Sequence, residues 1–346
     1  MERLRSWFQT NKRSLPWRDN PTPYSVWVSE IMLQQTRAEV VIPYFHEWMK
    51  KFPNIQSLAE APIESVIKTW EGLGYYSRAR NLHAGAQTII QQFSGQIPSS
   101  SDELNKIKGI GPYTIGAIRS FAFKQKAAAV DGNVLRVISR YKGIKEDIGK
   151  TKTRKLIENE VFKILPENAP WEIMEAFIEL GAQVCGKKAL CSSCPLKRDC
   201  YTNLNGQQKI LPIKEKKIQY EKRFRAVALI ENNQHFLVRK VNEGEIMSGL
   251  YEFFYIDLNS PEEEINKILT HLEKKSALPL IYRKKLPKVN HTFTRFRVQI
   301  LPFLLQTKEQ KEVPSYQWKT LEELDLLPFS SGHKKVLQNL KKIFKT

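Results

Sequence analysis

Four cysteines lie close together in the stretch CGKKALCSSCPLKRDC, where five, two and five residues separate Cys185, Cys191, Cys194 and Cys200. Thiolates spaced in this way can converge on one metal centre without long-range folding. Tetrahedral zinc and a cubane iron–sulfur cluster both use four cysteines. Tandem zinc knuckles usually present two CxxC pairs, and this chain has one, so the spacing favours a cluster and leaves zinc open. Four unrelated buried thiols are the alternative, but chance would scatter them.

Two carboxyl groups lie where one could act as a proton donor and the other as a stabilising anion. Glu30 lies in YSVWVSEIMLQQT, and Val26, Trp27 and Leu33 share its helical face, so we expect a poorly solvated carboxyl with a raised pKa. Asp131, in AAAVDGNVLRV, comes where an apolar run gives way to a helix. Such an aspartate either caps the helix or is an anion, kept ionised by helix-end N–H groups, that can stabilise a developing cation.

A glycine turn precedes this aspartate. In LNKIKGIGPYTIGAIRSFAF, Gly109 and Gly111 stand between two helical patterns, and Pro112 occupies a first helical position. Glycines permit a tight turn with open backbone N–H groups, and the next helix supplies its positive end, so a phosphate can dock there. The pattern predicts a helix-hairpin-helix over about residues 101–122.

The elements that position these residues are helical through the first half of the chain. Apolar positions recur every three or four residues up to about residue 200, with Pro, Gly and Ser between the runs. We expect a helical domain over 1–205 and a polar, lysine-rich linker over 206–222. The expected helices span residues 2–11, 25–39, 40–51, 62–71, 78–93, 101–107, 112–122, 132–141, 152–163 and 170–183.

After the linker the period of the apolar positions changes to two. RAVALI and HFLVRKV, joined by ENNQ, predict a β-hairpin, and RFRVQILPFLL predicts a later strand. The stretch SPEEEINKILTHLEKK between them predicts a helix. Residues 223–346 are therefore expected to form an α+β domain, which makes the protein multi-domain.

The composition favours a polyanionic partner. The 346 residues include 55 Lys and Arg against 36 Asp and Glu, a formal charge of +19. Because the basic residues are spread along the whole chain, charge alone leaves a merely basic protein open. We see no signal peptide and no run of roughly 20 apolar residues, so we expect a cytoplasmic protein without membrane contact. Disulfides are not expected, because all four cysteines lie in one short stretch.

Taken together, these motifs resemble a known group of enzymes. A helix-hairpin-helix, then the aspartate of VDGNV, then four closely spaced cysteines resembles the helix-hairpin-helix DNA glycosylase superfamily. Within it, SEIMLQQT, GPYT and the additional C-terminal domain resemble the adenine DNA glycosylase (MutY) family. The resemblance covers nearly the whole chain. It implies excision of adenine mispaired with 8-oxoguanine or guanine in duplex DNA, a [4Fe-4S] cluster in the loop 185–200, and a Nudix-like second domain.

The resemblance also implies roles for the residues of the site. Glu30 protonates N7 of the flipped adenine as general acid, and Asp131 stabilises the oxocarbenium-like sugar or bonds to it transiently. Tyr113 and Asn133 support the aspartate side of the site. We expect the pKa values of the two carboxyls to be tuned in opposite directions, because glycoside chemistry divides acid and anion work between two such groups.

Tyr113 separates two classes of enzyme. In the related endonuclease III type this position is a lysine, which attacks the sugar as an amine and permits strand cleavage. Tyrosine predicts a monofunctional glycosylase with little lyase activity, and the bifunctional glycosylase and lyase is the alternative enzyme. A lesion sensor without chemistry is disfavoured because both Glu30 and Asp131 are present.

Further residues are assigned to the DNA by resemblance. Trp17, Arg18 and Glu175 line the adenine pocket, although a solvated helix face is the alternative for Glu175. The residues that wedge around the opposite base are Gln35, Thr36, Leu73 and Tyr75. Core packing is the alternative for the last two, but the glycines on either side of them favour an exposed loop. We expect a monomer associated with the nucleoid.

The second domain resembles a reader of 8-oxoguanine through MSGLYEFF and VNHTFTRFRVQI. Phe293 and Thr294 fall in the reading loop, but Arg295 stands where the family has histidine, which puts the strength of the 8-oxoguanine preference in question. The glutamate-rich box of a Nudix hydrolase is absent from SPEEEINKILTHLEKK, so hydrolysis of nucleoside diphosphates is not expected. The first cysteine gap has five residues where the family has six.

Overall fold

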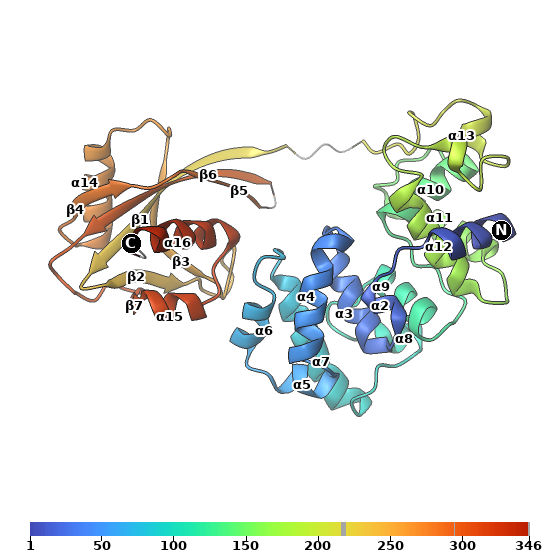
Figure 1. Cartoon of the computed structure of the whole chain (residues 1–346), viewed down its shortest axis with the longest axis horizontal. Coiled ribbons are helices and arrows are strands. Elements are labelled where there is room, and N and C mark those ends of the chain that lie inside the picture. The colour runs from blue at the N-terminus through green and yellow to red at the C-terminus, as the bar shows by residue number, and fades with distance from the viewer. Residues whose placement is uncertain (216–218, 294, 345–346) are drawn as a thin grey trace. The chain divides into compact units, whose positions relative to one another are not determined.

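The computed structural model describes residues 1–215, 219–293 and 295–344 and divides the chain into two compact units (Figure 1). The first unit contains Met1–Ala61 and Ser77–Lys216, and the second contains Pro62–Tyr76 and Lys217–Thr346. The predicted fold class, a helical domain followed by an α+β domain, is confirmed.

Among the described residues of the first unit, every named element is a helix. Helix α3 packs against α4 and α9, and α10 packs against α12, which brings the helices that carry the site residues together. The elements are α1 (Glu2–Asn11), α2 (Pro16–Asp19), α3 (Pro23–Leu33), α4 (Ala38–Lys51), α5 (Ile55–Glu60), α7 (Ser77–Phe93), α8 (Ser101–Leu104), α9 (Pro112–Ala117), the π-helical turn η1 (Ile118–Ala122), α10 (Gly132–Lys142), α11 (Thr151–Ile164), α12 (Pro170–Gln183), the 3₁₀ turn η2 (Cys191–Ser193) and α13 (Tyr201–Leu204).

Helix α3 begins and ends for local reasons. Thr22 caps it, accepting a hydrogen bond from the Ser25 N–H, and Pro23 occupies the first turn. We expected one helix over 25–39, but α3 ends at Leu33 and Gln35 adopts a left-handed backbone with φ 60°. That conformation cannot continue a right-handed helix, so the chain turns before α4.

The second unit is built on a mixed sheet that is covered on both faces. The strands lie in the order β4-β6-β1-β3-β2-β7, and β5 pairs with β6; β1 and β6 are parallel and the other pairs are antiparallel. Their bounds are β1 (Glu221–Asn232), β2 (His235–Lys240), β3 (Tyr251–Leu258), β4 (Ile281–Lys285), β5 (Val289–Phe293), β6 (Phe296–Gln306) and β7 (Gln317–Thr320).

Successive side chains of each strand point to opposite faces of this sheet, in line with the period of two of the apolar positions in the sequence. Val227 and Leu229 of β1 join the core that includes helices α15 (Leu321–Leu326) and α16 (Ser331–Phe344). Their neighbours Ala226 and Ala228 join the core beneath helix α14 (Ile265–Ser276). The helix predicted within SPEEEINKILTHLEKK is therefore present, but it begins at Ile265, five residues after the start of that stretch.

The segment Pro62–Tyr76, with helix α6 (Ile63–Thr69), is grouped with the second unit, whereas we expected it inside the helical domain over 1–205. Lys68 Nζ donates hydrogen bonds to the Asp325 and Leu327 carbonyls at 2.6 and 3.0 Å. The Glu71 carboxylate accepts from the Phe329 N–H at 2.9 Å and from Lys334 Nζ at 3.0 Å. These contacts join the segment to α15, to α16 and to the loop between them.

The described first part of the predicted linker packs on the first unit. The Leu211 side chain is 2% exposed, and its carbonyl accepts a hydrogen bond from Arg140 Nε at 2.8 Å. The Ile213 carbonyl accepts from the Ile148 N–H at 3.0 Å. At Leu211 and Ile213 the predicted linker is therefore held against this unit.

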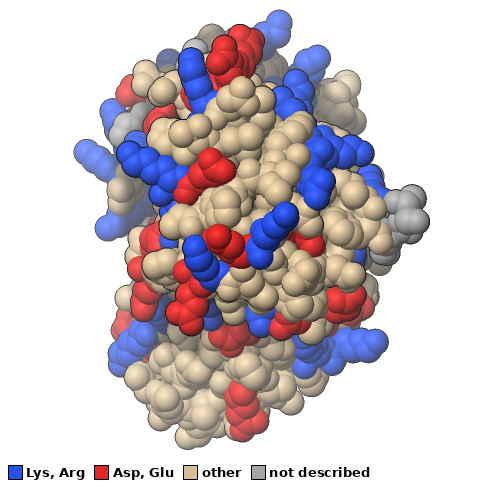
Figure 2. Space-filling view, turned by 90° about the vertical axis from the view of Figure 1, so that its left-hand side faces the viewer, with Lys and Arg blue, Asp and Glu red and all other residues tan. Residues whose placement is uncertain are grey.

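The charged side chains are mixed on the surface shown in Figure 2. Lys and Arg side chains there alternate with Asp and Glu, so the visible face carries no patch of one sign. Within the described ranges, no helix combines the length and apolar character needed to cross a membrane.

Candidate active site

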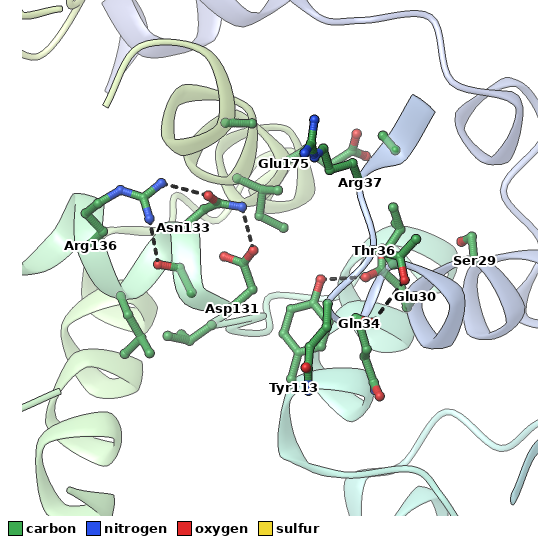
Figure 3. A pocket seen from close by; sticks show the side chains of 18 of the residues that line it. Ser29, Glu30, Gln34, Thr36, Arg37, Tyr113, Asp131, Asn133, Arg136 and Glu175 are labelled. Carbon is green, nitrogen blue, oxygen red and sulfur yellow. Dashed lines mark hydrogen bonds between the residues drawn. The ribbon is translucent and has the colours of Figure 1, made fainter. Parts of the chain in front are cut away.

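A cavity of about 1220 Å³ in the first unit collects most of the residues predicted to be catalytic or to bind the substrate. Helix α3, the loop after it, the start of α9, the start of α10 and helix α12 all contribute side chains to its wall (Figure 3). The predicted residues that line it are Trp17, Arg18, Glu30, Gln35, Thr36, Tyr113, Asp131, Asn133 and Glu175.

Glu30 is buried, with 6% of its surface exposed, and its carboxyl faces the cavity. Burial raises the pKa of Glu30 to about 7, the hydrogen bond from Tyr113 opposes that rise, and the negative charge of Asp131 adds to it. The sequence-based expectation of a carboxyl that resists ionisation is therefore confirmed. A carboxyl with this pKa is protonated in a substantial fraction of molecules at neutral pH.

Tyr113 is the direct partner of Glu30. Its hydroxyl donates a hydrogen bond of 2.5 Å to Oε2 of Glu30. Burial, followed by the charges of Glu30 and Asp131, raises the pKa of Tyr113 well above its ordinary value, so this hydroxyl stays a neutral donor. We had placed Tyr113 on the aspartate side of the site, and the hydrogen bond puts it on the glutamate side.

Asp131 is the N-cap of α10, so the capping interpretation is correct as local structure. Its carboxylate accepts from the Val134 N–H and from Asn133 Nδ2, each at 2.8 Å. Burial raises the pKa of Asp131, while these two donors lower it. The predicted opposition of the two pKa values is therefore wrong in direction, because the burial of Asp131 outweighs its helix-end hydrogen bonds.

Arg136 is a residue of the site that the sequence did not suggest. It donates to Asn133 Oδ1 and to the Gly181 carbonyl, each at 2.8 Å, and to the Cys185 carbonyl at 2.7 Å. Arg136 follows Asn133 by one helical turn, a spacing that places both on one face of α10 and could have identified it. The asparagine beside Asp131 is thereby tied to Cys185, the first residue of the cysteine loop. Figure 3 shows the hydrogen bonds from Arg136 to Asn133 and from Asn133 to Asp131.

Arg18 joins the cavity to two glutamates of α12. It pairs with Glu175 at 3.0 Å and with Glu179 at 2.8 Å. The Glu175 side chain is 17% exposed, so the alternative of a solvated helix face is wrong. Trp17 is 6% exposed and packs edge-to-face on Phe45, with 5.5 Å between ring centroids.

The two glycines of the hairpin differ in backbone and surroundings. Gly109 has φ 87°, and an added Cβ would lie 2.7 Å from Cβ of Asn81. Gly111 has an ordinary φ of −101°, caps α9, and has open space where a Cβ would stand. Gly109 is therefore required by the turn, as predicted, whereas Gly111 leaves room for a group to approach the start of α9. Neither glycine lines the cavity.

Three predicted substrate residues lie in the second unit. Leu73 is 7% exposed, so the expected exposed loop is wrong for this side chain, while Tyr75, with φ 49°, is 47% exposed. Phe293 ends β5 and packs against the core of the sheet. Thr294 lies outside the described residues.

The four cysteines line a second, smaller cavity of the first unit and form no disulfide. Arg140 Nη1 lies 3.5 Å from the Cys185 sulfur and donates to the Gly186 carbonyl at 2.7 Å. In the described part of the chain, no three Cys, His, Asp or Glu side chains stand close enough to hold a metal ion. Four thiols around one cavity, with a guanidinium beside them, nevertheless form a donor set that fits an anionic cluster.

Comparison with known families gives two matches. Residues 28–163 match the family described as HhH-GPD superfamily base excision DNA repair protein. Residues 226–339 match the NUDIX domain family.

Curated relatives match over almost the whole chain. The adenine DNA glycosylase of Mus musculus is 31% identical over 97% of this chain and 76% of its own length. The adenine DNA glycosylase of Homo sapiens is 31% identical over 97% of this chain and 72% of its own length. The adenine DNA glycosylase of Buchnera aphidicola subsp. Acyrthosiphon pisum is 30% identical over 97% of this chain and 96% of its own.

Solved structures share the fold. A thermostable thymine-DNA glycosylase superposes with a TM-score of 0.54 at 24% identity, covering 59% of this chain and 94% of that chain. A trapped endonuclease III–DNA covalent intermediate superposes with a TM-score of 0.51 at 23% identity, covering 60% and 94%.

Proposed function

The chain belongs to the adenine DNA glycosylase family, and from this premise we propose that it removes adenine from duplex DNA by hydrolysing the N-glycosidic bond. The observation that carries the proposal is that two carboxyl groups, those of Glu30 and Asp131, face one cavity (Figure 3). Glu30 accepts a hydrogen bond from Tyr113, and Asp131 accepts one from Asn133. Glycoside cleavage uses two carboxyl groups in different roles, and this cavity holds such a pair.

We propose that Glu30 is the general acid. The base must leave the helical stack to reach a buried carboxyl, because Glu30 is only 6% exposed. Protonated Glu30 then gives its proton to N7 of the flipped adenine, and Tyr113 holds the carboxyl in place. Protonation makes the base a better leaving group, and the electron pair of the glycosidic bond departs with it.

Asp131 stabilises the positive charge that develops on the sugar. Its two hydrogen-bond donors favour the anion even though burial opposes it. Burial disfavours the unpaired negative charge of Asp131, and the positive charge that develops on the sugar compensates it. A water molecule then bonds to C1′ of the sugar through its oxygen, and its second proton returns to the Glu30 carboxylate that gave one to the base. Asn133, held by Arg136, keeps Asp131 oriented.

We propose that the enzyme is monofunctional. The position that would need an amine nucleophile for strand cleavage is Tyr113, whose hydroxyl is engaged by Glu30 and whose pKa is raised. The bifunctional glycosylase and lyase remains the alternative, and a covalent DNA adduct trapped by borohydride at one lysine would support it.

The base opposite the adenine is proposed to be 8-oxoguanine or guanine. Gln35 and Thr36, in the loop between α3 and α4, are the opposite-strand contacts that line the cavity. Leu73, Tyr75, Phe293 and Thr294 are proposed as further contacts from the second unit, and Gly109 and Gly111 as phosphate contacts. Arg295 is exposed at this loop and is suited to a phosphate. All the catalytic groups come from one chain, so a monomer is sufficient.

The cysteine loop is proposed to hold a [4Fe-4S] cluster through Cys185, Cys191, Cys194 and Cys200. When bound, the cluster would cross-link the loop and fix its position. This chain's Arg140 would balance its negative charge, and Arg136 would connect the loop to Asn133 in the active site.

The deciding experiment uses a duplex with one adenine opposite 8-oxoguanine. After incubation with the full chain, alkali cuts the strand wherever the base has been lost. We expect strand breaks with the unaltered protein and a loss of about 100-fold or more in rate with Glu30→Gln. No breaks with the unaltered protein, or equal rates with Glu30→Gln, would refute the proposal. A duplex with thymine opposite 8-oxoguanine is the matched control.

A further inference from the structure

A completely buried carboxylate stands behind the cavity wall, and the chemistry proposed above does not use it. The Glu179 side chain on α12 is 0% exposed. Its Oε1 accepts from Arg13 Nε at 2.6 Å, and its Oε2 accepts from Arg18 Nη2 at 2.8 Å. Gln183, one turn further along α12, donates to Oε1 as well. Glu179 is thus saturated with donors and lies out of reach of a ligand.

Charge balance explains why such a group is tolerated. An unpaired buried carboxylate would be strongly unfavourable. Burial by itself would raise the pKa of Glu179, but the hydrogen bond from Arg13 and the charge of Arg18 outweigh it and lower that pKa. The carboxylate is therefore ionised, and it compensates the guanidinium groups that border the cavity.

Arg18 is held from three sides. Its Nη2 donates to Glu179, its Nη1 donates to the Arg13 carbonyl at 3.1 Å, and its Nε pairs with Oε2 of Glu175 at 3.0 Å. A planar guanidinium with three fixed contacts has one orientation. Because Arg18 engages Oε2, the other oxygen of Glu175 carries no hydrogen bond or ion pair with any described residue. Glu175 lines the cavity, and this oxygen is available there to accept a hydrogen bond.

We propose that Glu179 is a positioning residue that sets the base selectivity of the cavity, by holding Arg18 so that one oxygen of Glu175 stays available to accept a hydrogen bond from an exocyclic amino group. The inference rests on the proposed function. An amino-bearing purine such as adenine offers this donor, whereas hypoxanthine offers a carbonyl oxygen at the same position. A carbonyl facing a carboxylate oxygen is repelled, so the site rejects it.

Removing the charge of Glu179 changes this arrangement. In Glu179→Gln the size is kept, but Arg18 faces only one carboxylate. The guanidinium is then free to turn and engage both oxygens of Glu175 in a bidentate pair, which is the preferred geometry for these two groups. The acceptor for the amino group is lost, while Glu30 and Asp131 remain as they were.

The test compares two duplexes that differ only in the target base, which is adenine or hypoxanthine. In both duplexes the base opposite is 8-oxoguanine. Single-turnover rates at saturating enzyme give the adenine-to-hypoxanthine ratio. We expect Glu179→Gln to lower this ratio by about 10-fold or more, the size of effect that follows the loss of a hydrogen bond to a charged group. A residue that only supported the fold would lower both rates together and leave the ratio unchanged.

The matched control is Gln183→Ala. Gln183 also donates to Glu179, but it is exposed and bonds to the Asn11 carbonyl instead of reaching the cavity. This variant weakens the anchoring of α12 and leaves both arginine contacts, so the adenine-to-hypoxanthine ratio should stay within about twofold of the original.

A double variant covers the case in which Glu179→Gln does not fold. Glu179→Gln with Arg13→Met removes one charge of each sign, so no uncompensated arginine remains, and Arg18 still lacks its second carboxylate. The ratio should fall as in the single variant. A folded single or double variant with the original ratio would overturn the inference. Failure of the unaltered protein to release adenine would instead overturn the proposed function.

Discussion

The hydroxyl of Tyr113 lies 2.5 Å from Oε2 of Glu30, although 83 residues separate them in the chain. Glu30 belongs to α3, whereas Tyr113 is the second residue of α9, the helix that Gly111 caps. The turn proposed to hold a DNA phosphate and the proposed acid are therefore joined by one hydrogen bond. A displacement of the α9 start would reach the carboxyl directly.

The excision rate should fall as pH rises through about 7. Burial raises the pKa of Glu30 from 4.5 to about 7, and only the protonated form can donate a proton. For a single group with that pKa, the rate at pH 8 should be about tenfold below the rate at pH 6. Single-turnover rates across this range test the prediction. A rate that rises with pH would contradict it.

The stability of Glu30→Gln relative to the unaltered protein should increase as pH rises from about 4.5 to 7. The raised pKa means that the folded state binds this proton more tightly than the unfolded chain. The stability linked to it is complete below the unfolded value and is lost as pH passes the folded value. Thermal melts at pH 5 and pH 8 should show a larger advantage for the variant at pH 8. Equal differences at both pH values would exclude this linkage.

Tyr113→Phe should move the pH dependence of excision to higher pH. The tyrosine hydroxyl stabilises the ionised form of Glu30 and lowers the pKa of that carboxyl, so its removal lets the pKa rise further. We expect an upward shift of the midpoint and a rate at low pH within about tenfold of the original. An unchanged midpoint would mean that the hydrogen bond does not act on the acid.

Gly181→Ala should disturb the aspartate without touching a polar group. A Cβ on Gly181 would lie 2.5 Å from Cβ of Asn133 and 3.1 Å from its Cα, so the start of α10 must move. We expect a destabilisation of about 1–3 kcal/mol and at least tenfold slower excision. Urea melts and excision rates measure both. Gly132→Ala meets nothing within 4 Å and is the control for stability.

Replacing Cys194 with alanine should abolish iron binding. The four cysteines line one cavity, and loss of one thiol leaves the donor set incomplete. Iron content and absorbance near 400 nm of anaerobically purified protein report the cluster. Ser192→Ala, in the same loop, should retain both signals. An unaltered protein without iron would show that the cluster assignment is wrong.

The sequence predicted elements best where a local pattern determines them. Helix α12 spans Pro170–Gln183, the range that periodicity predicted, because Pro170 starts it and its apolar face is continuous. The break after Leu33 could not be predicted because neither proline nor glycine marks it. Gln35 adopts a left-handed backbone that its residue type does not favour, so the conformation depends on the rest of the fold. The alternation in β1 identified a strand but could not show its parallel partner β6.

Site residues were predictable where a motif carries them and not where a long-range contact makes them. Glu30 and Asp131 stand out because each interrupts an apolar pattern. Glu179 looked like one of several helical glutamates, since the arginines that define it lie 161 and 166 residues away. The raised pKa of Asp131 could not be predicted for a related reason. Its capping donors are close in sequence and visible there, whereas the residues that bury it come from distant parts of the chain.

The attachment of Pro62–Tyr76 to the second unit has a consequence for synthesis of the chain. Lys68 and Glu71 emerge from the ribosome 259 and 258 residues before their partners Leu327 and Phe329. At roughly 5–20 residues per second, helix α6 waits on the order of 10–50 s for those partners. The second unit, which includes this segment, therefore cannot be completed until nearly all of the protein has been translated.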